Sequence, residues 1–122
     1  MSALQTGLSE QQIQKSVFAH LRARAVPGAL FWHPFSGGFR RPKEAAIYKG
    51  LGAIAGLPDV MVLHAGQLYA IELKTETGRP TETQLRVIDA IRAAGGHAVV
   101  CRGLDRTIAC LEAWGILRGT SA

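Results

Sequence analysis

Apolar residues recur every three to four positions near the start of the chain, which is the spacing of one buried face of an α-helix. The stripe consists of Ile13, Val17 and Leu21. Ser9 lies in front of it in the N-cap position, and Gln12 completes a capping box three residues later. We expect this helix to run to about Arg24 and to end before Pro27-Gly28.

The middle of the chain changes to short apolar runs that are typical of strands. The segment ALFWHPF at 29–35 predicts a strand in spite of Pro34, which lacks a backbone donor. Two further strands are predicted at 60–64 and 68–74, joined by the segment HAGQ. The Gly-rich segment 36–56 between these strands predicts a long functional loop with one short helical turn around 44–49.

The helical spacing then returns once before the last strand and once after it. Thr81 and Gln84 form a second capping box, and the helix that follows runs to about Ala94 before Gly95-Gly96 ends it. Its inward residues are predicted to be Leu85, Ile88 and Ile91. A strand at 97–102 and a short helix at 105–114 complete the chain.

The predicted fold class is α/β, with a mixed β-sheet flanked by helices and the order α-β-β-β-α-β-α. The 122 residues are enough for a single domain with its own core, so we predict one domain over 1–122 that carries the basic loop 36–56 as an insertion. Trp32 and Phe35 are expected in that core or in a dimer interface, and the alternative is that they are platforms on which bases stack.

Composition narrows the class of protein. The start of the chain has no leader pattern and no apolar run is long enough to span a membrane, so we expect a soluble, cytoplasmic protein. Cys101 and Cys110 lie in apolar surroundings and are predicted to be small core residues. The net charge of +5 favours a polyanionic partner such as nucleic acid.

Three charged residues mark the ends of the otherwise apolar strand pair. If the HAGQ turn is centred between Ala65 and Gly66, Asp59 faces Glu72 across the hairpin, and Lys74 lies on the same face as Glu72. A loop of two or four residues gives this register, whereas a loop of three shifts it by one. Like charges in directly opposed positions repel each other, so we expect a positive group between the two acids.

Two opposed carboxylates are suitable ligands for a divalent cation such as Mg²⁺ (or Mn²⁺) that also binds a phosphodiester. Such a cation would polarise the phosphodiester and lower the pKa of an attacking water, and Lys74 would add a positive charge beside it. The alternative is that these charges form an ordinary solvated strand end, in which Glu72 pairs with Lys74.

The motifs around these charges resemble those of a known nuclease group. Pro58-Asp59, followed after a hairpin by Glu72-Leu73-Lys74, resembles the signature of the PD-(D/E)XK superfamily. GLPD at 56–59 and IELKTETGRPTETQ at 71–84 closely resemble the VRR-NUC family, which shows G-x-P-D, E-x-K and G-[RK]-x-[ST]-x-x-Q at these places. The resemblance extends more loosely to SEQQIQ at 9–14 and to GGHAVVCR at 95–102, and it implies a restriction-endonuclease-like core.

The resemblance also implies roles for individual residues. Asp59 and Glu72 would bind the metal, with the backbone carbonyl of Leu73 as a third oxygen ligand. Glu10 would supply an outer-shell or second-metal carboxylate from the first helix. Lys74 would orient or help to deprotonate the water, and Gln84 would support Lys74 or the phosphate. Gln84 and Glu10 each have an alternative, purely structural explanation. Gln84 completes a capping box, and an acid at position 10 suits a helix N-terminus.

Basic residues are candidates for contacts with the nucleic-acid backbone. These residues are Arg40, Arg41, Lys43, Lys49 and Arg79. Phe39 and Tyr48 are interleaved with the first four, a pattern that suits nucleic-acid binding, although a solvated basic loop would look the same.

The sequence therefore predicts a Mg²⁺-dependent DNA endonuclease. The resemblance implies a homodimer that acts on branched DNA such as a junction. Two alternatives share the same fold: a catalytically silent DNA-binding or assembly module, and an RNA-processing nuclease.

Overall fold

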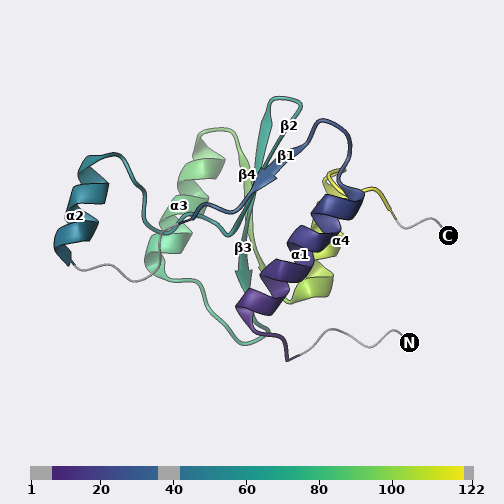
Figure 1. The fold of residues 1–122 in the computed structure, drawn as a ribbon, viewed down its shortest axis with the longest axis horizontal. Coiled ribbons are helices and arrows are strands. Elements are labelled where there is room, and N and C mark those ends of the chain that lie inside the picture. Colours follow the sequence, from purple (N-terminus) through teal and green to yellow (C-terminus); the bar gives the residue numbers. More distant parts are fainter. Residues whose placement is uncertain (1–6, 36–41, 120–122) are drawn as a thin grey trace.

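The computed structural model describes residues 7–35 and 42–119, and these form four helices and four strands (Figure 1). The helices are α1 (Glu10–Arg24), α2 (Pro42–Gly50), α3 (Glu82–Ala93) and α4 (Leu104–Ala113). The strands are β1 (Leu30–Trp32), β2 (Val60–His64), β3 (Gln67–Lys74) and β4 (His97–Arg102). The order confirms the predicted sequence of elements, and α2 lies where one short helical turn was predicted inside the segment 36–56.

The four strands form one mixed sheet in the order β1-β2-β3-β4, in which only β3 and β4 are parallel. The β2–β3 hairpin has the predicted register, because His64 pairs with Gln67 and the ladder continues to the pair of Val60 with Ile71. Its two-residue loop, Ala65 and Gly66, has positive φ angles of 51° and 79°, as hairpin turns of this length require.

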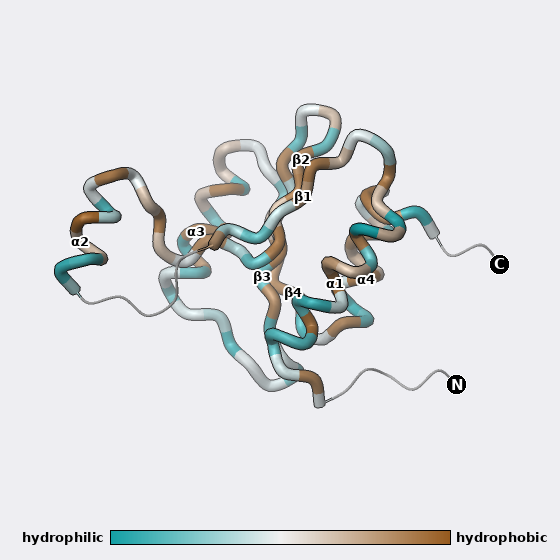
Figure 2. The backbone as a smooth tube through the Cα atoms, in the orientation of Figure 1, coloured by the Kyte–Doolittle hydropathy of each residue, from teal (hydrophilic) through white to brown (hydrophobic). Residues whose placement is uncertain are grey.

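Helices cover the two faces of the sheet (Figure 1). On one face, α1 and α4 pack over a core that takes in the predicted stripe Ile13, Val17 and Leu21 together with alternate residues of β2 and β3. On the other face, α3 packs over a smaller cluster around Ile88, Met61 and Ala70. Hydrophobic residues accordingly run along the strands in Figure 2, and they also occur in the helices, α2 included.

Both predicted capping boxes are present. The Ser9 hydroxyl accepts a hydrogen bond from the backbone N–H of Gln12, whose side-chain amide accepts the N–H of Ser9 at 2.8 Å. Thr81 and Gln84 form the same reciprocal pair at the start of α3. The first residues of α1 and α3 are thereby fixed, and both helices start beside the ends of β2 and β3 that carry the charged residues.

Several predictions differ from the structure. The strand expected at 29–35 is limited to Leu30–Trp32, where it pairs with β2 as an edge strand. Leu85, expected to point inward, is 43% exposed, because α3 presents Ile88 to the sheet and turns Leu85 toward solvent. Trp32 and Phe35 are 36% and 86% exposed and do not belong to the core. Cys101 is buried as expected, whereas Cys110 is half-buried, and neither forms a disulfide.

Helix α2 confirms the short helical turn predicted around 44–49 and extends it at both ends. Its sequence, PKEAAIYKG, places a proline in the first turn and good helix formers behind it, which is compatible with a helix. None of its residues is buried, and it stands away from the sheet and the other helices in Figure 1. Within the described part of the chain, no helix has the length and apolar character needed to cross a membrane.

Candidate active site

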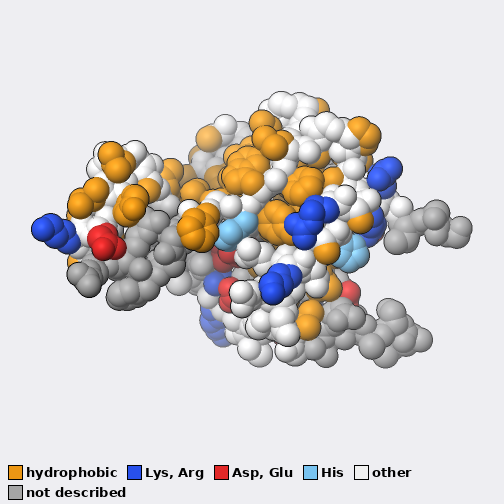
Figure 3. All heavy atoms as spheres, in the orientation of Figure 1, with side chains coloured by type: hydrophobic (Ala, Val, Ile, Leu, Met, Phe, Trp, Pro, Cys, Tyr) orange, Lys and Arg blue, Asp and Glu red, His pale blue; other side chains and the backbone are white. Residues whose placement is uncertain are grey.

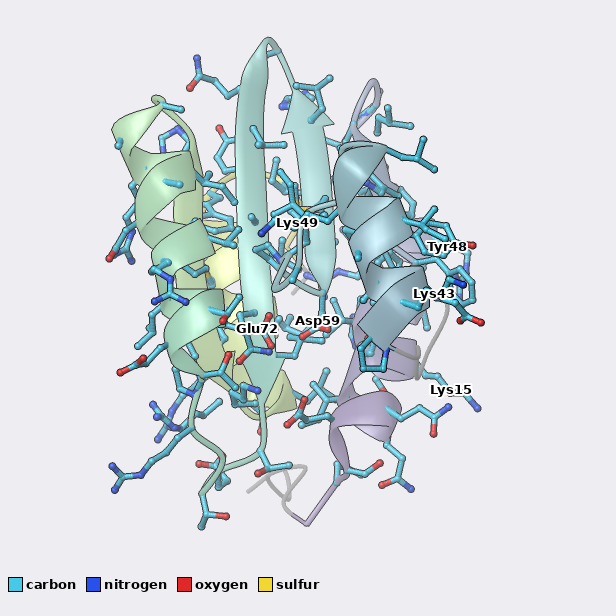
Figure 4. The ribbon with its side chains drawn as sticks, turned by 90° about the vertical axis from the view of Figure 1, so that its left-hand side faces the viewer. Lys15, Lys43, Tyr48, Lys49, Asp59 and Glu72 are labelled. Atoms are coloured by element: carbon cyan, nitrogen blue, oxygen red, sulfur yellow. The ribbon has the colours of Figure 1, made fainter. Side chains whose placement is uncertain are left out.

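The hairpin brings Asp59 and Glu72 together at one end of the sheet. Asp59 lies one residue beyond the last pair of the β2–β3 ladder, and its Oδ2 accepts a hydrogen bond of 2.9 Å from the backbone N–H of Leu73. Figure 4 shows the Asp59 and Glu72 side chains pointing toward each other. The two carboxylates therefore meet on one side of the sheet, as the predicted register requires.

Gly56 helps to set the path of the chain into Asp59. Its φ is +80°, and a Cβ at this position would lie 2.9 Å from the Thr83 methyl group and 3.2 Å from the Thr83 backbone. A side chain here would therefore be strained and would push the GLPD segment away from the first turn of α3. The glycine of this motif thus allows the segment before Asp59 to pack directly against α3.

A third carboxylate joins the pair from another element. Glu10, in the first turn of α1, has a carboxylate oxygen that lies with one oxygen each of Asp59 and Glu72 inside a cluster no wider than 4.8 Å. Oxygen atoms at such separations can bind one hard divalent cation. The structure thus brings together all three side chains that the sequence resemblance named as metal ligands.

Glu72 is the most buried member of the cluster, with 2% of the residue exposed. Burial, together with the charge and the hydrogen bond of Asp59, raises the pKa of Glu72 from its ordinary 4.5 to about 8, although Lys74 acts in the opposite direction. Its Oε2 has partners, whereas its Oε1 is buried without any hydrogen-bond partner among the described residues. Buried polar atoms normally have a hydrogen-bond partner, so a buried carboxylate oxygen without one, beside two other acids, fits a ligand of a bound cation.

Lys74 lies beside the acids, as its position on β3 predicted. Its Nζ is 3.6 Å from Glu72 Oε2 and 3.9 Å from Glu10 Oε2, and only 7% of the residue is exposed. The ammonium group therefore bridges two of the three acids from one side. Glu72 and Lys74 do form the ion pair that the alternative of a solvated strand end expected. This pair is buried, however, and Lys74 also lies within ion-pair distance of Glu10.

Gln84 caps α3 and also contacts the acidic cluster. Its amide oxygen accepts the N–H of Thr81 and closes the capping box, while its Nε2 donates a 3.0 Å hydrogen bond to Glu72 Oε2. In this structure the Gln84 amide supports Glu72 directly, and the expected support of Lys74 or the phosphate stays a prediction. One side chain fixes the start of α3 and the orientation of a buried carboxylate.

His33 belongs to the site but was missed by the sequence analysis. It follows β1, and its Nδ1 donates a 2.8 Å hydrogen bond to the backbone carbonyl of Asp59. Because the carbonyl can only accept, this contact assigns the proton to Nδ1. A histidine 26 positions before the aspartate gives no local signal of this contact, which depends on the pairing of β1 with β2.

The remaining predicted residues are more loosely connected with the site. The Leu73 N–H binds Asp59, and the role of its carbonyl stays a prediction. Lys43 and Lys49 are exposed on different sides of α2 in Figure 4, and Arg79 is exposed after β3. Arg40 and Arg41 lie outside the described residues.

Comparisons with known proteins agree with this arrangement. The family model of the VRR-NUC domain matches residues 38–105, more than half of the chain. A solved structure described as a VRR_NUC domain protein is 25% identical over 89% of each chain, with a TM-score of 0.73. A second, described as a VRR_NUC domain, has a TM-score of 0.57 at 23% identity, over 84% of this chain and 94% of its own, and shows the likeness of fold. No curated protein matches the chain.

The mixed sheet with its acidic cluster at one end defines a nuclease-type domain. The chain belongs to the VRR-NUC family. The predicted family and fold are therefore confirmed, and the acidic cluster is one that could bind a divalent metal.

Proposed function

We propose that this protein is a metal-dependent DNA endonuclease that hydrolyses phosphodiester bonds and leaves a 5′-phosphate. The observation that carries the proposal is the buried Glu72 carboxylate, whose Oε1 has no partner within the described chain although two other carboxylates and Lys74 surround it. Membership of a nuclease family supports the same reading.

The donor set fits a divalent cation. Asp59, Glu72 and Glu10 offer carboxylate oxygens, the ligands that Mg²⁺ and Mn²⁺ prefer, and the carbonyl of Leu73 is proposed as a further ligand. When bound, such a cation supplies Lewis-acid polarisation of a phosphodiester and lowers the pKa of a water molecule. Its charge would also lower the pKa of Glu72, because it would offset both the cost of burying an ionised carboxylate and the repulsion from Asp59.

The protein's own groups would orient and neutralise the reacting phosphate. Lys74, held by Glu72 and Glu10, places a positive charge at the edge of the acidic cluster, where a phosphate oxygen gains negative charge in the transition state. Gln84 keeps the Glu72 carboxylate in one orientation through its 3.0 Å hydrogen bond. His33 fixes the backbone of Asp59 from the opposite side of the hairpin.

The substrate we propose is branched DNA. The net charge of +5 favours a polyanion, and Lys43, Lys49 and Arg79 are exposed cations suited to phosphate contacts, with Arg40 and Arg41 proposed for the same role. The acidic cluster is accessible from the side on which Glu10 is exposed, since its side chain is 47% accessible.

A homodimer is the proposed assembly, because cleavage of both strands of a junction requires two active sites that symmetry can supply. Large apolar side chains that the described chain leaves exposed support it. On and after α2 these are Ile47, Leu51 and Ile54. Nothing in the described part of the monomer buries them, and a second copy would offer a surface of the same kind.

A cleavage assay tests the proposal. Wild-type protein is incubated with four-way and flapped DNA junctions in Mg²⁺ or Mn²⁺ and compared with Lys74→Met, which keeps the apolar stem but removes the buried charge. We expect metal-dependent cleavage by the wild type and a loss of roughly 10²-fold or more in the variant. Arg86→Ala on α3 is the control for loss of a surface charge. Binding of DNA without cleavage in either metal would favour a silent DNA-binding module, and preferential cleavage of RNA junctions would favour an RNA-processing enzyme.

A further inference from the structure

A hollow of about 410 Å³ lies between α1 and the edge strand β1. Its lining combines two cations, Lys15 and Arg22, with aromatic rings. The rings belong to Phe18, Phe31 and Trp32, and His33 lies at the same hollow. Figure 3 shows basic, histidine and hydrophobic side chains together on the face that α1 and β1 present. We call this hollow the α1–β1 groove.

The two cations of the α1–β1 groove lie on one side of α1. They are seven residues apart, which is two helical turns, and Phe18 lies between them. The Phe18 ring lies 6.3 Å from the Phe31 ring of β1, measured between centroids, and both rings line the groove. Within the described residues, neither Lys15 nor Arg22 forms an ion pair, so both charges are available to an anion.

His33 connects the groove with the acidic cluster. Helix α1 begins with Glu10, and Lys15 and Arg22 follow it at helix rises of about 7.5 Å and about 18 Å. His33 lines the groove and also donates its Nδ1–H to the Asp59 carbonyl. A strand of a few nucleotides that left the acidic cluster over His33 would therefore reach the groove and its two cations.

The aromatic lining distinguishes a single strand from a duplex. Trp32 is 36% exposed and belongs to the edge strand, where its ring is open to a neighbouring base. Bases of a duplex are stacked on each other and cannot reach such a ring, whereas unpaired bases stack on aromatic side chains without regard to sequence. Cations that follow the backbone beside an aromatic platform are the usual combination in sites for single-stranded nucleic acid.

We infer that the α1–β1 groove binds a single-stranded segment of DNA next to the acidic cluster, with its phosphates at Lys15 and Arg22 and a base against Trp32. This inference rests on the proposed nuclease function and adds to it a substrate feature, namely unpaired nucleotides beside the bond that is cut. The groove would thereby favour junctions with a splayed or flapped arm over continuous duplex.

Binding measurements without metal test the groove separately from cleavage. Fluorescence anisotropy is recorded with a labelled ten-residue oligothymidine and with a duplex of equal length, in EDTA, over a series of salt concentrations. We expect Lys15→Ala and Arg22→Ala each to weaken oligothymidine binding roughly three- to tenfold and to reduce the salt slope by about 0.7. Arg86→Ala, an exposed arginine of α3 that does not line the groove, is the matched control and should change neither value.

Tryptophan fluorescence tests the stacking. In a Trp114→Phe background Trp32 is the only tryptophan, and oligothymidine should quench its emission. Trp32→Phe, which keeps an aromatic face, should retain binding, whereas Trp32→Ala should lose at least about fivefold. Circular dichroism melting curves show whether each variant is folded.

The outcomes separate the groove from the nuclease proposal. Cleavage of junctions by the wild type, together with equal oligothymidine binding by Arg22→Ala and Arg86→Ala, would overturn the groove and leave the nuclease function standing. Absence of quenching in the Trp32-only protein would also overturn it. Groove-dependent binding without cleavage in any metal would support the groove and contradict the nuclease function.

Discussion

The Glu72 carboxylate lies at the end of a strand that is otherwise apolar, where it has the Asp59 carboxylate on one side and the Lys74 ammonium on the other. Without a divalent cation, its ionised form is opposed by burial and by Asp59. The protonated form is therefore held more tightly in the folded chain than in the unfolded one, and stability becomes dependent on pH.

The sign of this dependence follows from the raised pKa. Because the folded value is about 8 and the ordinary value is 4.5, the free energy of unfolding in EDTA should fall as the pH rises through this window, by at most about 1.4 kcal/mol per pH unit. Thermal melts between pH 5 and pH 8 measure it. Glu72→Gln, which cannot ionise, should lack this fall and should be the more stable protein at pH 8. Equal pH profiles for the two proteins would contradict the buried charge.

Gln84 combines a capping role and a site role, and two substitutions separate them. Thr81→Ala removes only the cap, whereas Gln84→Ala removes the cap and the donor to Glu72. Both should lower the free energy of unfolding by about 1 kcal/mol in chemical denaturation. Only Gln84→Ala should also reduce cleavage, by roughly tenfold. If both variants lost cleavage to the same degree, the hydrogen bond to Glu72 would have no function of its own.

At the scale of single residues, the sequence predicts contacts between residues a few positions apart. It does not show most contacts between residues that only the tertiary fold brings together. Gln84 was predicted as a cap because Thr81 is three positions away, but its bond to Glu72 requires α3 to lie across the end of β3. His33 depends likewise on the β1–β2 pairing. Charge and spacing predicted Asp59, Glu72 and Lys74, since opposed acids in an apolar hairpin are unusual without a chemical reason.

At the scale of elements, turn chemistry made the hairpin predictable. An Ala-Gly loop of two residues allows only one register, and that register places Asp59 near Glu72. In segment 36–56 the sequence predicted a helical turn around 44–49 but not its full length. The residues of α2 favour a helix by themselves, but they carry no apolar stripe that would mark where it begins and ends, and none of them is buried. The exposure of Leu85 similarly depends on how α3 is rotated over the sheet.

Helix α2 should contribute to binding but not to folding. Lys43→Ala/Lys49→Ala replaces two exposed cations in an element without buried residues, so the free energy of unfolding should stay within about 0.5 kcal/mol of the wild type. Affinity for DNA should fall for all sequences alike, and the salt slope should fall by about two. A calorimetric melt and a salt titration of binding measure the two quantities. Unchanged affinity and slope would mean that α2 does not contact DNA.

At the scale of the whole molecule, the family and the fold were predictable because the GLPD, ELK and TETQ motifs lie on adjoining elements in the predicted order. The residues of a dimer interface were not predictable, because a sequence pattern does not show which exposed apolar residues meet a second copy. Ile47 and Leu51 are 55% and 77% exposed on or next to α2.

The proposed homodimer makes a direct prediction for sedimentation. The 13.1 kDa chain should sediment as a species of about twice that mass at micromolar concentration. Ile47→Ser/Leu51→Ser should shift the protein toward monomer, whereas Leu30→Ser, which alters an exposed apolar residue of β1, serves as the control. A wild type that remains monomeric at 100 μM would contradict the homodimer.

A crystal soaked in Mn²⁺ and measured at the manganese absorption edge is the most direct test of the proposed metal centre. The predicted result is an anomalous peak from a manganese ion that the carboxylates of Asp59 and Glu72 bind, with Glu72 Oε1 as one of the ligands. The contradictory result is the absence of manganese from this cluster at saturating concentration, with the Glu72 carboxyl group protonated or satisfied by another donor.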